Sequence, residues 1–300
     1  MTDTIAPDWI AADWGTSNLR VWAMSATGDV LAEASSDQGM GKLDRAGFEP
    51  ALMDVAGKWI KGPMTVIACG MVGARQGWAE AKYDRVPCPA ATNGFTPAPT
   101  KDATLNVHII PGISQDSPAD VMRGEETQIA GFLSRNPGWD GVICLPGSHT
   151  KWVHVSADEI VSFQTYMTGE LFAAISDHTV LKHSVDSTGW DDAIFEAAVN
   201  ETMSRPERLA TNLFSLRAEG LLHNMNNEAA RSRLSGLLIG TELAGAKPYW
   251  LGQQIAVIGA GNIASLYVKA LGLQGAPATQ VQGDSVTLAG LIAAYRRLKG

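Results

Sequence analysis

A turn rich in glycine and hydroxyl groups lies near the start of the chain, between two apolar segments. Residues 12–20 read Ala-Asp-Trp-Gly-Thr-Ser-Asn-Leu-Arg, and they join two expected strands, 9–13 and 19–25. The glycine lets the backbone approach an anion closely, and the hydroxyls and turn N–H groups can donate hydrogen bonds to phosphate oxygens. An aspartate at a strand end can hold Mg²⁺, directly or through water. Taken alone, the segment is equally compatible with an ordinary hairpin turn. The predicted phosphate ligands are Asp13, Gly15, Thr16, Ser17 and Asn18, with Asp13 also the predicted metal ligand.

The same pattern returns in the second half of the chain. Residues 141–155 read Gly-Val-Ile-Cys-Leu-Pro-Gly-Ser-His-Thr-Lys-Trp-Val-His-Val, so that Gly147-Ser148 corresponds to Gly15-Thr16. A third expected strand follows each hairpin, over 30–35 and 160–166. Two similar halves are therefore predicted, and two such turns facing each other across a cleft can clamp a nucleotide triphosphate. The predicted ligands in the second turn are Gly147, Ser148, His149, Thr150 and Lys151, where Lys151 either neutralises a phosphoryl group or is a solvated strand residue.

Composition excludes several classes of protein. The chain has 300 residues, 45% of them hydrophobic, and a formal net charge of −8. The negative charge argues against a nucleic-acid or membrane-surface partner. The N-terminus has no signal-like segment and no apolar run approaches the length of a membrane span. The three cysteines, Cys69, Cys88 and Cys144, are expected to be reduced and mostly buried, which is typical of a cytoplasmic protein.

Apolar periodicity predicts a mixed α/β chain. Strands are expected over 64–69, 106–110, 255–258 and 278–281, and residues 86–100 are expected to form loop or edge structure. Thr168 and Asp284 are expected as N-caps of helices. A glycine-rich loop at 70–78 follows a strand, which is where open α/β sheets bind ligands. Helices are expected over 47–61, 121–133, 170–181, 191–202, 206–220, 231–246, 262–273 and 285–298.

Two adjacent glutamates are the best acid–base candidates. Glu125 and Glu126 follow Arg123-Gly124 at the expected start of a helix, just upstream of the second hairpin. A kinase acting on an alcohol needs a carboxylate to orient the hydroxyl and take its proton. Two glutamates at a helix start can also simply complement the helix macrodipole.

A second glycine motif lies near the C-terminus. Residues 259–264, Gly-Ala-Gly-Asn-Ile-Ala, match a dinucleotide-binding fingerprint, with Asp284 about 20 residues further on. A nicotinamide-dependent oxidoreductase would normally place several more βα units after this motif, and only one strand and one helix remain. A turn that packs against the nucleotide's base or ribose fits better, and a ligand-free strand-to-helix turn is the alternative. The predicted adenosine-binding residues are Gly259, Ala260, Gly261 and Asn262.

Taken together, these motifs resemble the actin, hexokinase and heat-shock-chaperone ATPase superfamily. A closer resemblance, to the 2-dehydro-3-deoxygalactonokinase family, rests on blocks that occur in the family's order over essentially the whole chain. These blocks are residues 12–20, 69–73, 109–112, 122–128, 145–152, 167–171 and 235–240. The resemblance implies two ribonuclease H-like domains with an interdomain cleft, and an ATP- and Mg²⁺-dependent kinase.

The resemblance also implies the reaction. The γ-phosphoryl group of ATP would pass to the 6-hydroxyl of 2-dehydro-3-deoxy-D-galactonate, in D-galactonate catabolism. Gly124-Glu125 lies where related carbohydrate kinases have a Gly-Asp catalytic pair, which makes Glu125 the expected base and Glu126 the second choice. Pro146 stands where many superfamily members have an aspartate, so metal binding would fall to Asp13 alone. The residues expected to bind the sugar acid are Arg20, Arg75, Arg123, Thr168 and Glu170, and the sequence does not choose which arginine holds the carboxylate.

The sequence also predicts where the two domains meet and leaves other functions open. A first domain over 1–133 and a second over 134–300 are predicted, with the helix at 285–298 packing back across the cleft. Rival functions are a kinase of the same fold acting on another keto-deoxy sugar acid or ketose, and a nucleotide-switched assembly protein. The expected partner is a small sugar acid, with no nucleic acid and no membrane. A homodimer is one oligomeric state that the sequence leaves open.

Overall fold

The computed structural model describes residues 5–91, 94–259 and 261–300. The chain forms two compact units. The first holds the described residues up to Trp139, then Ser156–Ser162 and Gly283–Gly300, and the second holds Asp140–Val155 and the described residues of 163–282. This grouping differs from the predicted division after residue 133, because the chain enters the first unit again at two later places. The two domains predicted from the sequence, over 1–133 and 134–300, therefore stay a prediction.

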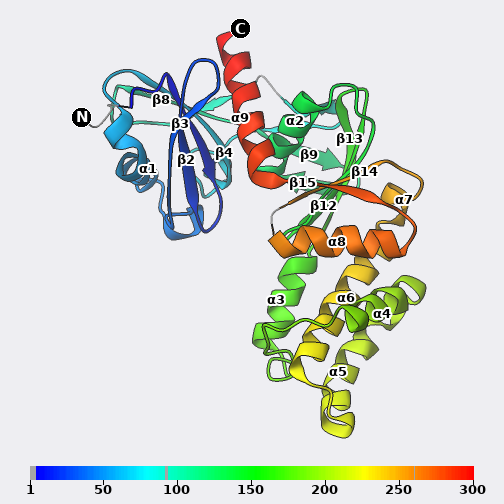
Figure 1. The fold of residues 1–300 in the computed structure, drawn as a ribbon. Coiled ribbons are helices and arrows are strands. Elements are labelled where there is room, and N and C mark those ends of the chain that lie inside the picture. Colours follow the sequence, from blue (N-terminus) through cyan, green and yellow to red (C-terminus); the bar gives the residue numbers. More distant parts are fainter. Residues whose placement is uncertain (1–4, 92–93, 260) are drawn as a thin grey trace. The chain divides into compact units, whose positions relative to one another are not determined.

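The first unit is built on a sheet with strand order β3-β2-β1-β4-β8-β7 (Figure 1). Strands β1, β2 and β3 form antiparallel hairpins, whereas β4 and β8 run parallel to β1. The carboxyl ends of β1 and β4 therefore lie at one edge of the sheet, where the first predicted phosphate turn begins. The bounds are β1 Trp9–Trp14, β2 Leu19–Met24, β3 Val30–Ser36, β4 Met64–Gly70, β7 Thr96–Pro97 and β8 Leu105–Ile109.

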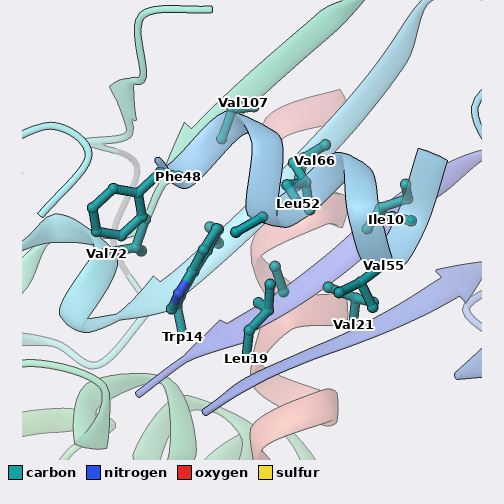
Figure 2. Packing of buried hydrophobic residues seen from close by; sticks show 14 of the residues in the cluster. Ile10, Trp14, Leu19, Val21, Phe48, Leu52, Val55, Val66, Val72 and Val107 are labelled. Carbon is teal, nitrogen blue, oxygen red and sulfur yellow. The ribbon is translucent and has the colours of Figure 1, made fainter. Parts of the chain in front are cut away.

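Helix α1 (Phe48–Ala56) covers one face of this sheet. Figure 2 shows Phe48 and Leu52 of α1 packed over Trp14 and Leu19 of the hairpin strands. All four side chains are fully buried, and each such burial stabilises the fold by about 1.5–3 kcal/mol. This apolar core packs against β1 and β2 and thereby holds the two strands that flank the first phosphate turn.

Helix α9 (Gly283–Lys299) covers the opposite face. The ring of Tyr295 stacks on Trp9 at a centroid distance of 4.3 Å and an interplanar angle of 6°. Such a pair adds about 0.5–1.5 kcal/mol beyond area burial. Helix α9 also lies along α2 (Glu125–Arg135), as Figure 1 shows. The helices approach closely because each has a glycine at the contact: a Cβ on Gly131 would lie 1.8 Å from the Val286 carbonyl oxygen, and one on Gly290 would lie 1.9 Å from that of Thr127.

A small sheet leads directly into α2. Strands β5 (Tyr83–Arg85), β9 (Gly112–Asp116) and β10 (Ala119–Met122) form it, in the order β10-β9-β5. The sequence prediction of a helix from residue 121 was wrong at its start, because Met122 pairs with Ile113 and Gly124 has a φ of +107°. Helix α2 therefore begins at Glu125.

The second unit repeats the strand order of the first. Its sheet runs β15-β14-β11-β12-β13, with β11 and β12 antiparallel and β14 parallel to β11. This order matches β8-β4-β1-β2-β3, as the internal repeat predicts. The bounds are β11 Gly141–Leu145, β12 Thr150–Ser156, β13 Glu159–Tyr166, β14 Ile255–Gly259 and β15 Ala278–Gln282. The first residues of β13 pair with β6 (Cys88–Pro89) within the first unit.

Helices surround this second sheet and extend beyond it. Helix α6 packs tightly on α4 because Cβ atoms on Gly236 and Gly240 would lie 2.5 Å from the carbonyl oxygens of Phe195 and Val199. The bounds are α3 Thr168–His178, α4 Asp192–Ser204, α5 Leu209–His223, α6 Asn227–Gly245, α7 Lys247–Trp250 and α8 Gly261–Leu273. Two cap predictions were wrong by one residue or more: Met167 caps α3 instead of Thr168, and Asp284 lies inside the first turn of α9.

Two sequence predictions about the chain as a whole can be compared with the structure. Cys69, Cys88 and Cys144 are all buried free thiols, which confirms that prediction. None of the helices in the described ranges combines the length and the apolar composition needed to span a bilayer.

Candidate active site

The first phosphate turn is a tight loop held from behind by a second segment. The Gly15 N–H donates to the Asn18 carbonyl at 2.9 Å, and Thr16, Ser17 and Asn18 are exposed. The N–H groups of residues 39, 40 and 41 donate to the carbonyls of residues 17, 15 and 16. A Cβ on Gly39 would lie 2.3 Å from the Ser17 carbonyl carbon, so only glycine allows this approach. The support from residues 39–41 was not predicted, although its Gly-Met-Gly sequence was a readable signal.

A cavity of about 750 Å³ opens over this turn. The antiparallel register pairs Leu19 with Ser36 and Arg20 with Ser35, which brings the end of β3 beside the turn. Sequence reasoning missed this contribution because it depends on strand register. The lining comprises Asp13, Gly15, Thr16, Ser17, Asn18, Arg20, Ser35, Ser36 and Asp37.

Asp13 is half-buried at the end of β1 and pairs with Arg20. Its Oδ2 lies 2.7 Å from one Arg20 nitrogen, and another Arg20 nitrogen lies 2.5 Å from Oδ1 of Asp284 on α9. Burial alone lowers the pKa of Arg20, but hydrogen bonds to Asp284 and Asp13 raise it by more, so its net pKa lies above the ordinary value. Arg20, one of three predicted ligands for the sugar carboxylate, is therefore already engaged by two carboxylates.

The ends of β1 and β4 meet the start of α2 through two glycines. Gly70 has a φ of +87°, and a Cβ on it would lie 2.6 Å from the Trp14 carbonyl oxygen and 3.6 Å from Oδ1 of Asp13. A Cβ on Gly124 would lie 3.3 Å from the Gly70 Cα. Both positions need the left-handed conformation and the missing side chain that glycine provides. The predicted metal ligand and the predicted base, Glu125, thus stand on backbone segments in contact.

The two glutamates have different surroundings. Glu125 is half-buried, and its carboxylate accepts the Arg123 N–H at 3.1 Å. Glu126 is fully buried, and its two oxygens accept the Gly124 N–H at 2.6 Å and the Thr127 hydroxyl at 3.0 Å. Burial, followed by the nearby Glu125 charge, raises the pKa of Glu126 to about 8. Glu126 therefore fixes the backbone at the start of α2 and has no surface to offer a substrate.

The other two candidate arginines also differ. Arg123 stacks over the Tyr83 ring at 4.3 Å and donates to the Ala81 carbonyl at 2.8 Å. Its Nε and Nη1 are buried without a hydrogen-bond partner in the described residues. Arg75 is exposed on the glycine-rich loop after β4, and its own carbonyl accepts a hydrogen bond from Arg45. Arg75 is the exposed one of the three candidates, whereas Arg20 and Arg123 are half-buried.

The second phosphate turn lies between β11 and β12. Gly147, Ser148 and His149 are exposed, but Thr150 and Lys151 are buried. The Thr150 hydroxyl lies 3.0 Å from the Tyr267 hydroxyl. The alternative that Lys151 is a solvated strand residue was therefore wrong.

The start of α3 is docked on this turn. A Cβ on Gly169 would lie 2.2 Å from the Gly147 carbonyl oxygen, and the Glu170 N–H donates to the Ser148 carbonyl at 2.9 Å. The Glu170 carboxylate forms a short hydrogen bond with Nε2 of His149. Thr168 is buried and donates to the buried carboxylate of Glu242 on α6. Sequence reasoning missed Glu242, which lies two residues after the 235–240 block.

A cavity of about 710 Å³ adjoins the second turn within the second unit. Its lining combines Gly147 and Gly169 at the turn with Asn262 at the start of α8. Gly259 ends β14 and Gly261 begins α8 with a φ of +64°, whereas Ala260 lies outside the described residues. Apolar and aromatic side chains from α3, α6, α8 and the segment before α4 contribute Phe172, Trp190, Leu238, Ile239, Ile263, Leu266 and Tyr267, and the charged residues Asp192, Arg231 and Lys269 line the cavity as well.

This second cavity has the properties of a site for a nucleoside. Polar and charged groups set among apolar and aromatic side chains are typical of sites for cofactors and other small ligands. Of the turn, Gly147 reaches the lining, and Phe172, Trp190 and Tyr267 bring aromatic rings to the same cavity. The arrangement suits a ligand with a charged end and a flat apolar end.

The metal prediction can be compared with the acidic groups near the first turn. In the described residues, no three His, Cys, Asp or Glu side chains gather into a cluster that could hold a metal ion. Mg²⁺ in kinases needs only one or two carboxylates, since phosphates and waters complete its octahedron. Asp13, with Oδ2 bound to Arg20 and Oδ1 beside Gly70, fits a role as a single carboxylate ligand.

Comparison with known proteins gives the family. A model of the 2-keto-3-deoxy-galactonokinase family matches residues 13–294. A Rhizobium meliloti protein named probable 2-dehydro-3-deoxygalactonokinase DgoK1 is 40% identical over 98% of this chain and 99% of its own length. The Escherichia coli 2-dehydro-3-deoxygalactonokinase is 33% identical, over 94% of this chain and 96% of its own.

Solved structures support the same assignment. The crystal structure of a protein of this family from Sinorhizobium meliloti has a TM-score of 0.90 and 38% identity, covering 96% of this chain and 98% of that one. Component A of the Acidaminococcus fermentans (R)-2-hydroxyglutaryl-CoA dehydratase shares the fold alone, with 12% identity, a TM-score of 0.54, and 97% and 99% of the two chains covered. These similarities confirm the predicted fold class, an α/β protein of the actin-like ATPase type with two ribonuclease H-like domains. Because the family model and both relatives span nearly the whole chain, the protein belongs to the 2-dehydro-3-deoxygalactonokinase family of sugar-acid phosphotransferases.

Proposed function

We propose that the protein transfers the γ-phosphoryl group of ATP to the 6-hydroxyl of 2-dehydro-3-deoxy-D-galactonate. The observation that carries this proposal is the family match over residues 13–294, which contains both phosphate turns and the Gly124-Glu125 helix start. The side chains of a kinase take little part in covalent chemistry, because phosphoryl transfer depends mainly on positioning the two substrates and neutralising the phosphate charge. The motifs described above supply those functions.

The second unit is proposed to bind the nucleotide. The N–H groups and hydroxyl of Gly147-Ser148 would donate to phosphate oxygens, and the apolar lining beside them would take the adenosine. Asn262, at the start of α8, is the polar group best placed for the ribose or base, and Trp190 offers the aromatic surface. Thr150, with its hydroxyl on Tyr267, is assigned to holding the turn.

The first unit is proposed to bind the acceptor and supply the base. Glu125 would accept the proton of the 6-hydroxyl, because it is the accessible carboxylate of the pair. Arg75 would hold the sugar carboxylate, since Arg20 is bound by Asp13 and Asp284 and Arg123 by Tyr83 and Ala81. When bound, Mg²⁺ neutralises phosphate charge, and Asp13 is the residue that would hold it.

A coupled assay for ADP release tests the reaction. Purified protein with MgATP is given 2-dehydro-3-deoxy-D-galactonate, its gluconate epimer, or D-galactonate. Release with the first compound and little with the others supports the proposal. Release with the epimer at equal efficiency would widen the substrate class to keto-deoxy sugar acids. No release from folded protein that binds ATP would overturn the proposed substrate and favour another acceptor or a non-catalytic nucleotide switch.

The Glu125→Gln variant tests the base. It keeps the shape of the side chain and removes its ability to take a proton, so turnover should fall about 100-fold or more while the dissociation constant for MgADP stays within twofold. Glu33→Gln, an exposed glutamate on the edge strand β3, is the matched control and should be fully active. Turnover of Glu125→Gln within threefold of wild type would remove Glu125 from the mechanism.

A further inference from the structure

Glu242 is a buried carboxylate that no step of the proposed reaction uses. It lies in the last turn of α6 and is 2% exposed. Its Oε1 accepts the indole N–H of Trp152 at 2.8 Å, and its Oε2 accepts the Tyr267 hydroxyl at 2.7 Å and the Thr168 hydroxyl. The three donors come from β12, α8 and α3, which are far apart in sequence.

A buried carboxylate at this position calls for an explanation, because an apolar side chain would fill the same space with a smaller loss of hydration free energy. Moving a carboxylate out of water is unfavourable unless hydrogen bonds replace its hydration. Burial raises the pKa of Glu242, and hydrogen bonds from Thr168, Tyr267 and Trp152 oppose that shift. The indole N–H can only donate, so it needs an acceptor at this point in the core.

The donors lead from Glu242 to the second phosphate turn. Thr168 is the first residue of α3, and the next two residues are docked on Gly147 and Ser148. A movement of Thr168 would therefore displace the turn through one or two peptide units. On the other side, the Tyr267 hydroxyl is hydrogen-bonded to both Glu242 and Thr150, which lies two residues after Ser148. Thr168, Tyr267 and Gly147 all line the 710 Å³ cavity.

We infer that Glu242 is a positioning residue for the nucleotide. It fixes the second phosphate turn and α8 relative to each other, so that the phosphates and the adenosine of one nucleotide can both fit the cavity. Glu242 itself touches no ligand. This inference rests on the proposed function in one respect: it takes the cavity of the second unit as the nucleotide site.

Two threonine substitutions of identical chemistry provide the main test. Thr168→Val removes one donor to Glu242 and keeps the shape of the side chain. Thr202→Val is the matched control, because Thr202 is also fully buried in the second unit and its hydroxyl lies 3.1 Å and 3.0 Å from the carbonyls of Ala198 and Leu237, at the α4–α6 contact. The dissociation constant for MgADP is measured by calorimetry, together with the free energy of unfolding, for both variants.

The expected result separates positioning from stability. Thr168→Val should weaken MgADP binding at least about tenfold, as expected for the loss of a hydrogen bond to a charged group. Thr202→Val should change it less than twofold at a comparable loss of stability. Thr168 was predicted from the sequence to bind the sugar acid, but its hydroxyl donates to Glu242. In steady-state kinetics, Thr168→Val should therefore raise KM for ATP and leave KM for the sugar acid within twofold. Equal weakening of MgADP binding by the two variants would show a merely structural role and overturn the inference.

Substitution of Glu242 itself gives a second, independent test. In Glu242→Gln, the amide oxygen can still accept from Trp152 and the amide N–H can donate to a hydroxyl, so nucleotide affinity should be partly retained. Glu242→Leu removes every acceptor and should lower the affinity well below that of Glu242→Gln. Wild-type affinity in both variants would contradict the inference. If the wild-type protein binds no MgADP at all, the proposed nucleotide site fails first, and the inference fails with it.

Discussion

At the scale of single residues, the site depends on which charged groups already have partners. Arg20, Arg75 and Arg123 are indistinguishable as cations in the sequence. The structure pairs Arg20 with two carboxylates and seats Arg123 on Tyr83, whereas Arg75 stays exposed. An exposed guanidinium can form a bidentate pair with a substrate carboxylate, which favours Arg75.

Replacement of Arg75 tests this assignment. Arg75→Gln should raise KM for the sugar acid about 10- to 100-fold, since a hydrogen bond to a charged group contributes roughly 1.5–3 kcal/mol. KM for ATP should change less than twofold. Arg45→Gln controls for damage to the loop, because Arg45 donates to the Arg75 carbonyl. An unchanged KM for the sugar acid in Arg75→Gln would transfer the role to another cation.

Glu126 should make stability depend on pH. Its pKa is raised from 4.5 to about 8 in the folded protein, so the native state binds more protons than the unfolded state between these values. Its contribution to stability is therefore fully present below about pH 4.5 and is lost as pH rises to about 8. Glu126→Gln stays neutral and can keep both hydrogen bonds, so it should lack this dependence.

Urea unfolding of both proteins at pH 5.5 and pH 8.5 measures the effect. The stability of wild type relative to Glu126→Gln should fall by roughly 3 kcal/mol between these pH values. Glu80→Gln, an exposed glutamate in the same unit, should follow wild type. Parallel pH profiles for wild type and Glu126→Gln would show that Glu126 titrates normally.

At the scale of elements, glycines decide how closely α2, the helix that carries the proposed base, can pack against its neighbour. Helix α2, which begins with the proposed base, lies against α9 through Gly131 and Gly290. A side chain at either position would force the helix backbones apart, because the nearest atoms are backbone carbonyls. The precise position of Glu125 therefore depends on a contact that is distant in sequence.

Substitution of Gly290 tests this dependence. Gly290→Ala should destabilise the protein by about 3 kcal/mol and lower kcat, because overpacking shifts α2. Gly272→Ala is the control: it is a glycine in helix α8 with open space around its Cβ, and alanine there should stabilise the helix by about 0.5–1 kcal/mol. Normal kcat in a destabilised Gly290→Ala protein would mean that α2 keeps its position by other contacts.

At the scale of the whole molecule, the two units repeat one strand order but differ in what surrounds it. The first unit covers its sheet with α1 and α9, and the second adds the helices α4, α5 and α6 and lines its cavity with aromatic as well as polar side chains. The proposed division of roles follows from this difference. The acceptor and base belong to the first unit, and the nucleotide belongs to the second. The predictions of a cytoplasmic location and of a homodimer stay predictions.

Nucleotide binding should stabilise the protein by mass action. At a free MgADP concentration about 100 times its dissociation constant, stability should rise by about 2.7 kcal/mol, and the unfolding midpoint should rise accordingly. Calorimetric scans with MgADP, with inorganic phosphate and without ligand measure this shift. If the protein is active but MgADP leaves every transition unchanged, the nucleotide does not bind the native state as proposed.

The sequence by itself determined the elements and the kind of chemistry. The two turns, the Gly124-Glu125 pair and the order of the strands are local patterns, set by glycine, hydroxyl and apolar spacing. Those patterns sufficed for the fold class and for the family. The helix predicted from residue 121 was wrong at its start because strand pairing determines the structure there. Residues 121 and 122 pair with β9 as part of β10, and Gly124 has a positive φ.

Only the tertiary structure decided which of the candidate groups are accessible and which are supports. Glu126 was the second choice for the base and Thr150 a predicted phosphate ligand, yet both are buried and bound to protein groups. Glu242 carried no local signal, because its three donors come from strands and helices separated by 25 to 90 residues. The physical reason is that burial and hydrogen-bond partners depend on long-range packing, whereas turns and periodicity depend on residues close together in the chain.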